Sequence, residues 1–502
     1  MLIPNIKNRG KKPIYECIYE YIKGEILSGK LKGGEKLPSR RQMALDNGVA
    51  EITVAGAYAQ LLTEGYIESR EKRGYFVLPQ PVDNREQPEK KGVDAVNIRD
   101  RKKAYINSDK KKEDCSPGDI QNKSNHPGNN MTQASETCIR INLSDSSLPE
   151  DIFPFDTWSK LTRRILSMER VECIKAPSPQ GLLDLRIAIS DYLRDSRGFY
   201  ADPEKIVIAP GTEYLNEMVL YLIGGVRFVA MEDPGYPAIS TLYENSANKC
   251  LHIPVDKYGL ITEGLEGQNI KLIHVSPSHH FPLGVIMSAP RRAELSAWAA
   301  RADAWIVEDD YDSEFRFEGR PVPPFVSTYP DRVVYMNTFS RTLSPSIRMA
   351  YMVLPDSLYD IYVRKLSARS GAVSTLNQLT LRSFISEGYY ERHINRMKNY
   401  YRKRKSAIKE IASDKLSDFF ECEGDGSGMM FLLKPKAKKV IKKEETFLIN
   451  LKKRGIILNS TGDYCYNRLV IPNNRYIVNF GSVTEDDFEE ASHIICDVIK
   501  EL

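Results

Sequence analysis

The sequence predicts two folded parts, a small N-terminal α+β domain and a large C-terminal α/β domain built on a mostly parallel sheet. The chain has 502 residues, which is too long for one hydrophobic core at roughly 150 residues per domain. Three helical segments and two short strands fill the beginning of the chain, whereas short apolar segments alternate with helical ones from Ile141 onward. We place the domains at residues 1–78 and 141–502, with a flexible polar linker at residues 79–140.

Charge and cysteine usage indicate the kind of environment. The net charge is +4; residues 1–78 hold 13 Lys and Arg against 9 Asp and Glu, and the remainder is balanced at 58 against 58. A modest basic excess in the first part is compatible with a DNA-facing domain. The eight cysteines form no C-x-x-C pair, no signal peptide is evident, and no apolar run reaches the roughly 20 residues that cross a bilayer. We expect a cytoplasmic protein with reduced cysteines, no metal site and no membrane association.

The first two helices are predicted from apolar spacing and a start signal. Apolar and aromatic residues recur at helical spacing from Ile14 to Leu27. After a turn at residues 33–38, Ser39-Arg40-Arg41-Gln42 has the S-x-x-Q pattern of a capping box. This pattern predicts a second helix that ends near Asn47-Gly48.

The third helix and a β-ribbon follow directly. The spacing predicts a helix from about Ala50 to Glu64, and residues 65–69 and 73–77 predict a two-stranded wing with Gly74 at its turn. Three short helices followed by a β-ribbon are typical of a winged helix-turn-helix.

These residues resemble the GntR family of bacterial regulators. The resemblance rests on ordered motifs over about 65 residues: Lys36-Leu37-Pro38-Ser39 with Arg41, Gly48-Val49, Thr53-Val54, Ala57-Tyr58, Leu61 and Glu64-Gly65-Tyr66. It implies that Arg41 and Thr53 contact phosphates, that the third helix enters the major groove, and that Gly74 lets the wing approach the minor groove. We therefore assign six residues to the interface with a double-stranded DNA operator: Ser39, Arg40, Arg41, Glu51, Thr53 and Gly74. The ordinary alternatives are that Arg41 is only solvated and that Thr53 only packs.

One residue departs from the GntR pattern. The family usually has a basic residue two places before Thr53, and this chain has Glu51. Phosphate repels a carboxylate, although a carboxylate can accept a hydrogen bond from a cytosine amine. DNA binding remains the prediction.

The linker is predicted from composition. Residues 79–140 are rich in Pro, Asn, Ser, Asp and Lys, with basic clusters at residues 99–103 and 110–112. Such composition does not support a packed core. The basic clusters either touch DNA or are simply solvated, and solvation is the more common case.

The large domain shows a succession of short buried strands separated by helices. The predicted strands are residues 205–209, 226–231, 272–275, 304–307 and 333–336. This alternation indicates a mostly parallel sheet, in which ligands bind at the carboxyl ends of the strands.

Polar residues follow three of these strands. Gly211-Thr212 comes after the first at a helix start, where backbone amides can hold a phosphate. An acidic run that begins at Glu308-Asp309 follows the fourth, and Thr338, Ser340 and Arg341 follow the fifth, with Arg348 seven residues later. Two hydroxyls and an arginine form a phosphate cup, and an acid at Asp309 can pair with a protonated pyridine nitrogen.

This part of the chain resembles fold-type I aminotransferases and, among them, the MocR subgroup, in which a GntR domain is fused to an aminotransferase-like domain. The motifs are Phe153-Pro154 with Trp158, Gly181 with Leu185-Arg186, Glu232-Asp233-Pro234-Gly235-Tyr236, Pro277-Ser278-His279 with Phe281-Pro282 and Gly284, Met287-Ser288 with Arg291-Arg292, the run from Asp309 to Phe315, and Thr338-Phe339-Ser340.

The resemblance implies roles toward pyridoxal 5'-phosphate. Asp309 would meet the pyridine nitrogen, Tyr311 the ring hydroxyl and Tyr236 the ring face. The phosphate would be held by Thr338, Ser340 and Arg348, with Gly211 and Thr212 at the helix start. Structural alternatives are a core aromatic for Tyr236, a helix cap for Asp309 and an ion-pair partner for Arg348.

Arg341 stands where this family has its Schiff-base lysine. A guanidinium stays protonated at physiological pH and is not a nucleophile, so no internal aldimine is expected and any cofactor would bind noncovalently. The nearest lysines are Lys271 and Lys365, so no shift of register supplies the amine. Transaminase activity is therefore not expected.

The effector side of the pocket also departs from the family. His280 replaces a common glutamine, and Gly426–Met430 replaces Gly-Leu-His. Arg475, ahead of the last strand, is the candidate for an effector carboxylate, and His280 is a second candidate. We predict a regulator that senses a small anionic effector as a head-to-tail homodimer. The alternatives are an active aminotransferase and a dimeric DNA-binding protein with a ligand-free pocket.

Overall fold

The computed structural model describes residues 1–4, 12–70, 73–79, 139–145, 147–149, 152–225, 228–317, 322–424, 428–466 and 475–502. Almost all of the predicted linker, residues 79–140, lies outside these ranges, and so do Val226, Arg227 and Gly426. Among the described residues no helix is long and apolar enough to cross a membrane.

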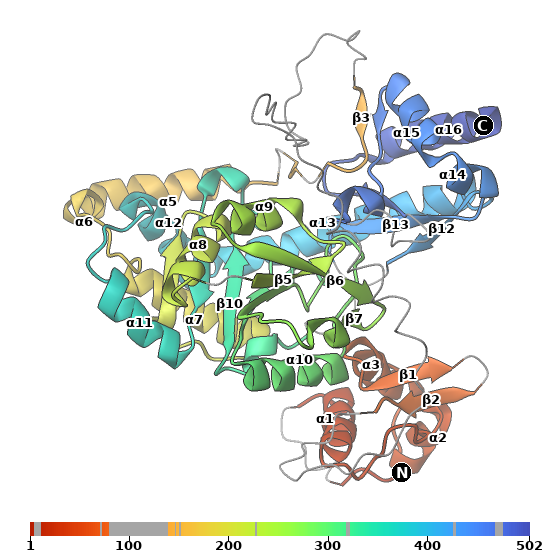
Figure 1. The fold of residues 1–502 in the computed structure, drawn as a ribbon, viewed down its shortest axis with the longest axis horizontal. Helices are drawn as coiled ribbons and strands as arrows, with labels where there is room; N and C mark the ends of the chain where they lie inside the picture. The colour runs from red at the N-terminus through yellow and green to blue at the C-terminus, as the bar shows by residue number, and fades with distance from the viewer. Residues whose placement is uncertain are drawn as a thin grey trace, which may run out of the picture. The chain divides into compact units, whose positions relative to one another are not determined.

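The N-terminal domain is a winged helix-turn-helix, as predicted (Figure 1). Its elements are α1 (Ile14–Leu27), α2 (Arg40–Asn47), α3 (Glu51–Thr63), β1 (Ile67–Arg70) and β2 (Gly74–Val77). The strands pair antiparallel from Ile67 opposite Val77 to Arg70 opposite Gly74. Gly74 has φ 101°, a conformation that favours glycine at the turn of the wing. The apolar face of α1, with Ile18, Ile22 and Ile26, packs on α3.

The start of α2 corrects one detail of the prediction. Ser39 caps the helix by accepting from the Gln42 N–H (3.1 Å). The side chain of Gln42 does not complete a capping box, because it donates to Asp46 one turn later (2.6 Å). The Gln42 side chain extends along the helix toward Asp46, an acceptor on the same face, and so it does not turn back toward the backbone N–H of Ser39.

The large domain is built on an eight-stranded sheet of order β4-β11-β10-β9-β8-β5-β6-β7. The strands are β4 (Ile206–Ala209), β5 (Phe228–Asp233), β6 (Lys249–Asp256), β7 (Gly259–Leu260), β8 (Leu272–Val275), β9 (Trp305–Asp309), β10 (Val333–Thr338) and β11 (Ala350–Val353). Strands β10, β9, β8, β5 and β6 are parallel, each to its neighbour in this order. β11 is antiparallel to both β10 and β4, so β4 runs in the same direction as β10.

Helices cover both faces of this sheet. The helices are α5 (Phe155–Met168), α6 (Arg170–Ile174), α7 (Leu183–Arg197), α8 (Thr212–Leu222), α9 (Pro237–Asn245), α10 (Ala289–Ala302), α11 (Asp356–Leu366), α12 (Thr375–Ser386) and α13 (Tyr389–Lys415). Short 3₁₀ turns are η3 (Pro203–Lys205), η4 (Thr262–Leu265), η5 (Phe325–Ser327) and η6 (Pro345–Ile347).

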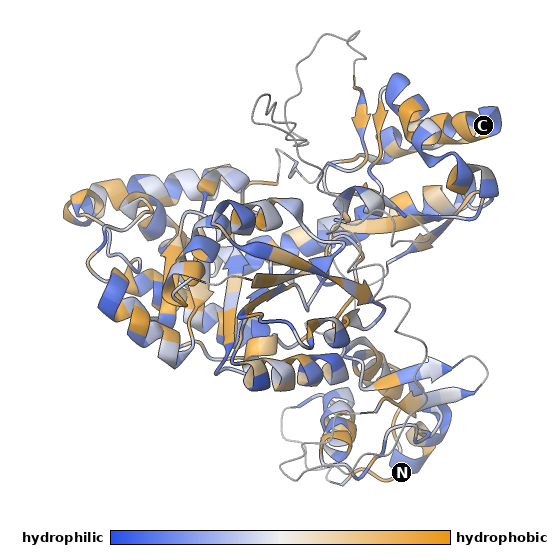
Figure 2. Ribbon diagram, viewed as in Figure 1, coloured by the Kyte–Doolittle hydropathy of each residue, from blue (hydrophilic) through white to orange (hydrophobic). Residues whose placement is uncertain are grey.

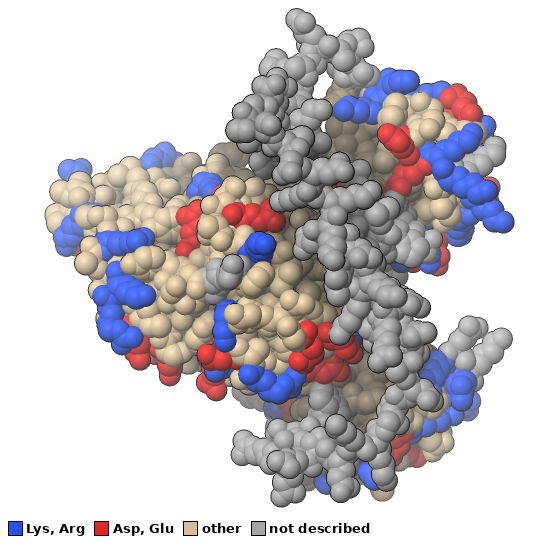
Figure 3. Space-filling model, in the orientation of Figure 1, with Lys and Arg blue, Asp and Glu red and all other residues tan. Residues whose placement is uncertain are grey.

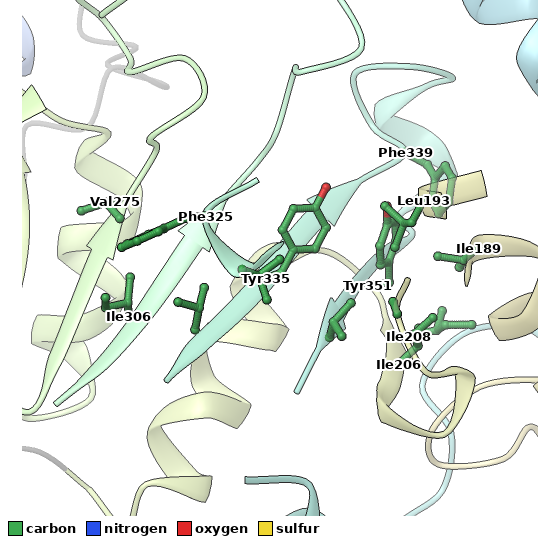
Figure 4. Close-up of a cluster of buried hydrophobic side chains, with 14 of the residues drawn as sticks. Ile189, Leu193, Ile206, Ile208, Val275, Ile306, Phe325, Tyr335, Phe339 and Tyr351 are labelled. Carbon is green, nitrogen blue, oxygen red and sulfur yellow. The ribbon is translucent and has the colours of Figure 1, made fainter. Parts of the chain in front are cut away.

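Two hydrophobic cores fill the space between the sheet and the helices on its two faces. Val333 and Tyr335 of β10 pack toward α7, α10 and α12, whereas Val334 and Met336 pack toward α8, α9 and α11. Figure 4 shows part of the first core, where Ile189 and Leu193 lie beside the sheet. Because side chains alternate along a strand and both faces are buried, the strands are mostly apolar and become polar toward their carboxyl ends, as the orange and blue segments in Figure 2 show.

The C-terminal part adds a small antiparallel sheet of order β12-β13-β15. Its elements are β12 (Phe420–Glu423), β13 (Met430–Pro435), α14 (Lys438–Lys442), α15 (Glu444–Lys453), β14 (Ile456–Ile457), η7 (Thr461–Tyr464), β15 (Tyr476–Asn479) and α16 (Glu485–Glu501). β14 pairs in parallel with β3 (Ile141–Asn142), and a separate apolar core joins this sheet to α13, α15 and α16.

Candidate functional site

A cavity of about 330 Å³ lies at the carboxyl ends of the strands. β4, β5, β8, β9 and β10 run in one direction, so the residues that follow them meet at one edge of the sheet. The cavity is lined by all nine of the residues predicted to bind a cofactor: Gly211, Thr212, Tyr236, Asp309, Tyr311, Thr338, Ser340, Arg341 and Arg348.

One end of the cavity is a cup of hydroxyls, backbone amides and a guanidinium. A Cβ atom on Gly211 would lie 3.0 Å from an Nη atom of Arg348, so glycine here lets the guanidinium approach the start of α8. Thr338 Oγ1 lies 3.1 Å from Ser340 Oγ and accepts from the Ser340 N–H (3.2 Å). A helix start, two hydroxyls and an arginine together suit a phosphate.

Asp309, at the end of β9, has one buried oxygen left for a ligand. Its Oδ2 lies 3.6 Å from His274 Nε2, whereas its Oδ1 is buried and has no hydrogen-bond partner among the described residues. A buried acceptor without a partner is costly, and a ligand N–H would satisfy it.

A chain of hydrogen bonds supports the histidine beside Asp309. Tyr243 donates to Asn216 Oδ1 (2.6 Å), so its oxygen accepts from Nδ1–H of His274 (3.1 Å). Asn216 in turn donates to the Thr212 carbonyl at the start of α8 (2.9 Å). The acid end and the phosphate end of the site are therefore joined through side chains that fix their orientation.

Tyr311 is one end of a short chain of polar groups. Its hydroxyl is 3.2 Å from His279 Nδ1, which is 2.8 Å from Asp312 Oδ2. Burial, together with the Asp312 carboxylate, raises the pKa of Tyr311 well above its usual value, and Arg341 acts in the opposite direction. Tyr311 therefore keeps its proton and can donate a hydrogen bond to a ligand oxygen.

Glu232 is a buried carboxyl in the cavity wall. Burial raises its pKa to about 8, although the Ser276 N–H donates to Oε2 (2.9 Å) and favours ionisation. The group holds a proton at neutral pH and is a neutral donor beside the ligand space.

The two residues predicted to bind an effector are not part of the cavity lining. His280 is buried with Nε2 3.0 Å from the Pro234 carbonyl, and burial lowers its pKa to about 3. Arg475 pairs with Glu423, which also pairs with Lys434 (2.9 Å). Neither His280 nor Arg475 lines the cavity, whereas Ile477, two residues after Arg475, does.

Several lining or supporting residues were not anticipated from the sequence. His274 had a visible signal, because it interrupts the apolar strand Leu272-Ile273-His274-Val275. Tyr243 and Asn216 lie inside amphipathic helices and give no signal of their own. Tyr464 reaches the cavity from the C-terminal part, which sequence spacing does not reveal. Met429 and Met430 also line the cavity, and they belong to the stretch 426–430 that the resemblance places on the effector side of the pocket.

The predicted DNA-binding residues lie at the start of α2, the start of α3 and the wing. Arg40 and Arg41 are exposed in the first turn of α2, Glu51 is exposed and Thr53 half-buried in the first turn of α3. α3 itself contains neither Lys nor Arg. The basic side chains of the predicted DNA interface are therefore Arg40 and Arg41 of α2. Figure 3 shows Lys and Arg side chains over the part of this domain that carries β1 and β2.

Comparison with known proteins identifies both domains. Residues 14–77 match the family described as bacterial regulatory proteins, gntR family, and residues 139–494 match aminotransferase class I and II. The chain is 33% identical over 422 residues to the uncharacterised HTH-type transcriptional regulator YdeL of Bacillus subtilis, covering 84% of each chain. It is 34% identical over 425 residues to the probable rhizopine catabolism regulatory protein MocR of Rhizobium meliloti, covering 84% of this chain and 81% of that protein.

Solved structures agree on the fold of the large domain. The crystal structure of Pyrococcus horikoshii kynurenine aminotransferase matches with a TM-score of 0.63 at 22% identity, covering 73% of this chain and 92% of that one. The chain therefore belongs to the MocR subgroup of GntR-type transcriptional regulators, with a winged helix-turn-helix joined to a domain of the pyridoxal-phosphate-dependent aminotransferase fold.

Replacement of Arg41 tests the predicted DNA interface. Arg41→Ala should weaken binding to duplex DNA and lower the slope of log affinity against log salt by roughly one, as expected for the loss of one phosphate contact. Fluorescence anisotropy at several salt concentrations measures both quantities. Lys30→Ala, at an exposed lysine paired with Glu25, is the control; an unchanged slope in Arg41→Ala would remove Arg41 from the interface.

Glu232 makes a specific contribution to the pH dependence of stability. Its folded pKa of about 8 exceeds the value of about 4.3 in an unfolded chain. The folded state therefore holds a proton that the unfolded chain releases, and the stability from this group is lost as pH rises between those values. Glu232→Gln should lose less thermal stability than the wild type from about pH 5 to about pH 9, and exposed Glu263→Gln should behave as wild type. Parallel wild-type and Glu232→Gln curves would contradict the protonated carboxyl.

Proposed function

We propose that this cytoplasmic regulator binds pyridoxal 5'-phosphate, or a similar small anionic effector, noncovalently in the cavity of its aminotransferase-like domain. The observation that supports this most directly is the pairing of the phosphate cup with the unpartnered Asp309 Oδ1 in one cavity. Both features suit a ligand with a phosphate at one end and an N–H donor at the other.

The residues present fit pyridoxal phosphate part by part. Thr338, Ser340, Arg348 and the amides at the start of α8 would hold the phosphate, and Asp309 would hold the pyridine nitrogen. Tyr311 would donate to the ring hydroxyl, and the exposed ring of Tyr236 would lie against the ligand ring. When bound in an enzyme, this cofactor supplies an electron sink for bonds next to its carbonyl carbon.

Arg341 supports binding without covalent attachment. Among the described residues that line the cavity none is a lysine, and Lys271 donates instead to the Ala302 carbonyl (2.8 Å). The Arg341 guanidinium remains protonated, so it attracts an anion but does not attack an aldehyde. These properties disfavour a transaminase and favour a sensor.

A relative gives further support for this ligand class. The chain is 28% identical over 398 residues to PdxR of Corynebacterium glutamicum, an HTH-type pyridoxine biosynthesis transcriptional regulator. We expect a regulator of pyridoxine biosynthesis to respond to a molecule derived from pyridoxine, and we propose the same class of effector for this chain.

Calorimetric titration with pyridoxal phosphate tests the proposal. The wild type should show saturable heat, and Arg348→Ala should bind about tenfold or more weakly because a charged hydrogen bond to phosphate is lost. Arg364→Ala, an exposed arginine on α11, is the matched control and should bind as the wild type does. Absence of heat with the wild type would favour the ligand-free dimeric DNA-binding protein.

Arg341→Lys tests the reason for noncovalent binding. The introduced amine should condense with the cofactor aldehyde, release water and produce an absorbance band and a borohydride-trapped mass adduct that the wild type lacks. Arg332→Lys, at a surface ion pair with Asp303, should give neither signal. If Arg341→Lys binds the cofactor without them, residue 341 does not face the aldehyde.

We also propose that the large domain forms a homodimer through the α5–α6 segment. Met168, Val171 and Ile174 lie within seven residues of one another and are 79%, 63% and 85% exposed. Apolar side chains gathered on a surface in this way are typical of a protein interface.

A triple substitution tests the interface. Changing Met168, Val171 and Ile174 to Lys should give a monomer by size-exclusion chromatography with light scattering. Ile441→Lys with Ile449→Lys, at exposed sites on α14 and α15, should leave a dimer. A dimer in both variants would place the interface elsewhere.

A further inference from the structure

The outward side of α3 is apolar beyond its first residue. In a helix-turn-helix the second helix lies in the major groove, where its N-terminal residues contact the edges of the bases. In this chain that helix is α3, and the match to the gntR family assigns DNA binding to this domain. Ile52 is 82% exposed, Ala59 is exposed and Ala55 is half-buried. These three residues are spaced i, i+3 and i+7, so they share one side of the helix.

The polar side chains of α3 beyond its first turn are bound within the domain. Tyr58 and Thr63 each donate from their hydroxyl to a backbone carbonyl oxygen at 2.8 Å. Gln60 is buried, and its side-chain amide donates to Glu64 Oε1 (2.6 Å). The hydrogen-bonding capacity of this helix is therefore directed mainly into the protein.

The outward side of α3 also lacks the side chains that read purines. In the major groove guanine is recognised by Arg or Lys and adenine by Asn or Gln, each through two hydrogen bonds. α3 contains no Lys, Arg or Asn, and its one glutamine is the buried Gln60. A purine that faces this helix therefore finds no partner of that kind on it.

Thymine presents a different feature in the major groove. Its C5 methyl group is apolar, and apolar side chains contact it. Contact between this methyl group and the side chain of Ile52 would remove both from water, which stabilises the complex. The small side chain of Ala55, on the same side of the helix, allows the backbone of α3 to lie close to the bases.

We propose that Ile52 reads a thymine methyl group, and that the operator therefore carries thymine at the base pair that faces Ile52. The phosphate contact expected from Arg41 positions the domain on DNA but carries no sequence information. The inference concerns the operator and does not rest on the ligand proposed for the large domain.

Deoxyuridine tests the proposal, because it pairs as thymine does and lacks only the C5 methyl group. The full-length protein is first used to select its strongest-binding duplex from a library with a random central segment. That duplex is then remade with deoxyuridine at one thymine at a time, and the affinity is measured by fluorescence anisotropy. At the thymine that faces Ile52 the replacement should weaken binding about fourfold, as expected for the loss of one buried methyl group.

Variants connect this effect to Ile52. In Ile52→Ala the same deoxyuridine replacement should leave the affinity nearly unchanged, because the contact is already lost, whereas Ile52→Val should retain part of the effect. Leu27→Ala, at an exposed leucine that ends α1, is the matched control and should show the full wild-type effect. Since Ile52 lies outside the core of the domain, its replacement should not unfold the protein.

The inference is overturned by an affinity that no deoxyuridine replacement changes, by an effect of deoxyuridine that is equally large in Ile52→Ala, or by a selection that enriches no duplex. The first result excludes methyl recognition. The second assigns the effect to another residue or to the shape of the DNA, and the third shows that α3 reads no sequence. Ligand binding in the large domain is tested separately by the calorimetric titration.

Discussion

The direction of the strands is the constraint on which the site depends. β4, β5, β8, β9 and β10 share one direction, so residues separated by more than a hundred positions emerge at the same edge of the sheet. The apolar cores on both faces hold the strands in place, so the polar residues that end these strands gather at that edge. The phosphate cup, Asp309 and the His274 network are the consequence of this arrangement.

In the proposed function, a single side chain separates binding from catalysis in this cavity. The groups proposed to hold a phosphorylated pyridine line one cavity, and the position at which the resemblance expects a nucleophilic amine holds the guanidinium of Arg341. Arginine keeps its charge and its hydrogen-bond donors and gives up the ability to form a covalent bond with an aldehyde. A regulator needs only a difference in binding free energy between two states, so the loss of chemistry carries no penalty for sensing.

Much of this organisation is encoded in local sequence patterns. The winged helix, the parallel sheet and the convergence of Gly211, Asp309 and Thr338 were predictable, because each depends on short-range periodicity or on the residues at the carboxyl end of a strand. The contact of Met430 on β13 with Ile477 on β15 was not predictable, since strands far apart in sequence bring these two residues together. Arg475 illustrates the same limit. It pairs with Glu423 on β12, and the spacing of residues in the sequence does not predict this ion pair.

Hydrogen–deuterium exchange tests reversible recognition at the phosphate cup most directly. Exchange is measured without pyridoxal phosphate, with saturating pyridoxal phosphate, and again after the ligand has been removed by dialysis. If the cup holds the ligand reversibly, exchange should slow in the amides of residues 212–215 and 338–341 and should return fully to the starting rates once the ligand is dialysed away. Unchanged exchange in both segments, or protection that persists after dialysis, would contradict a reversible ligand held by the cup.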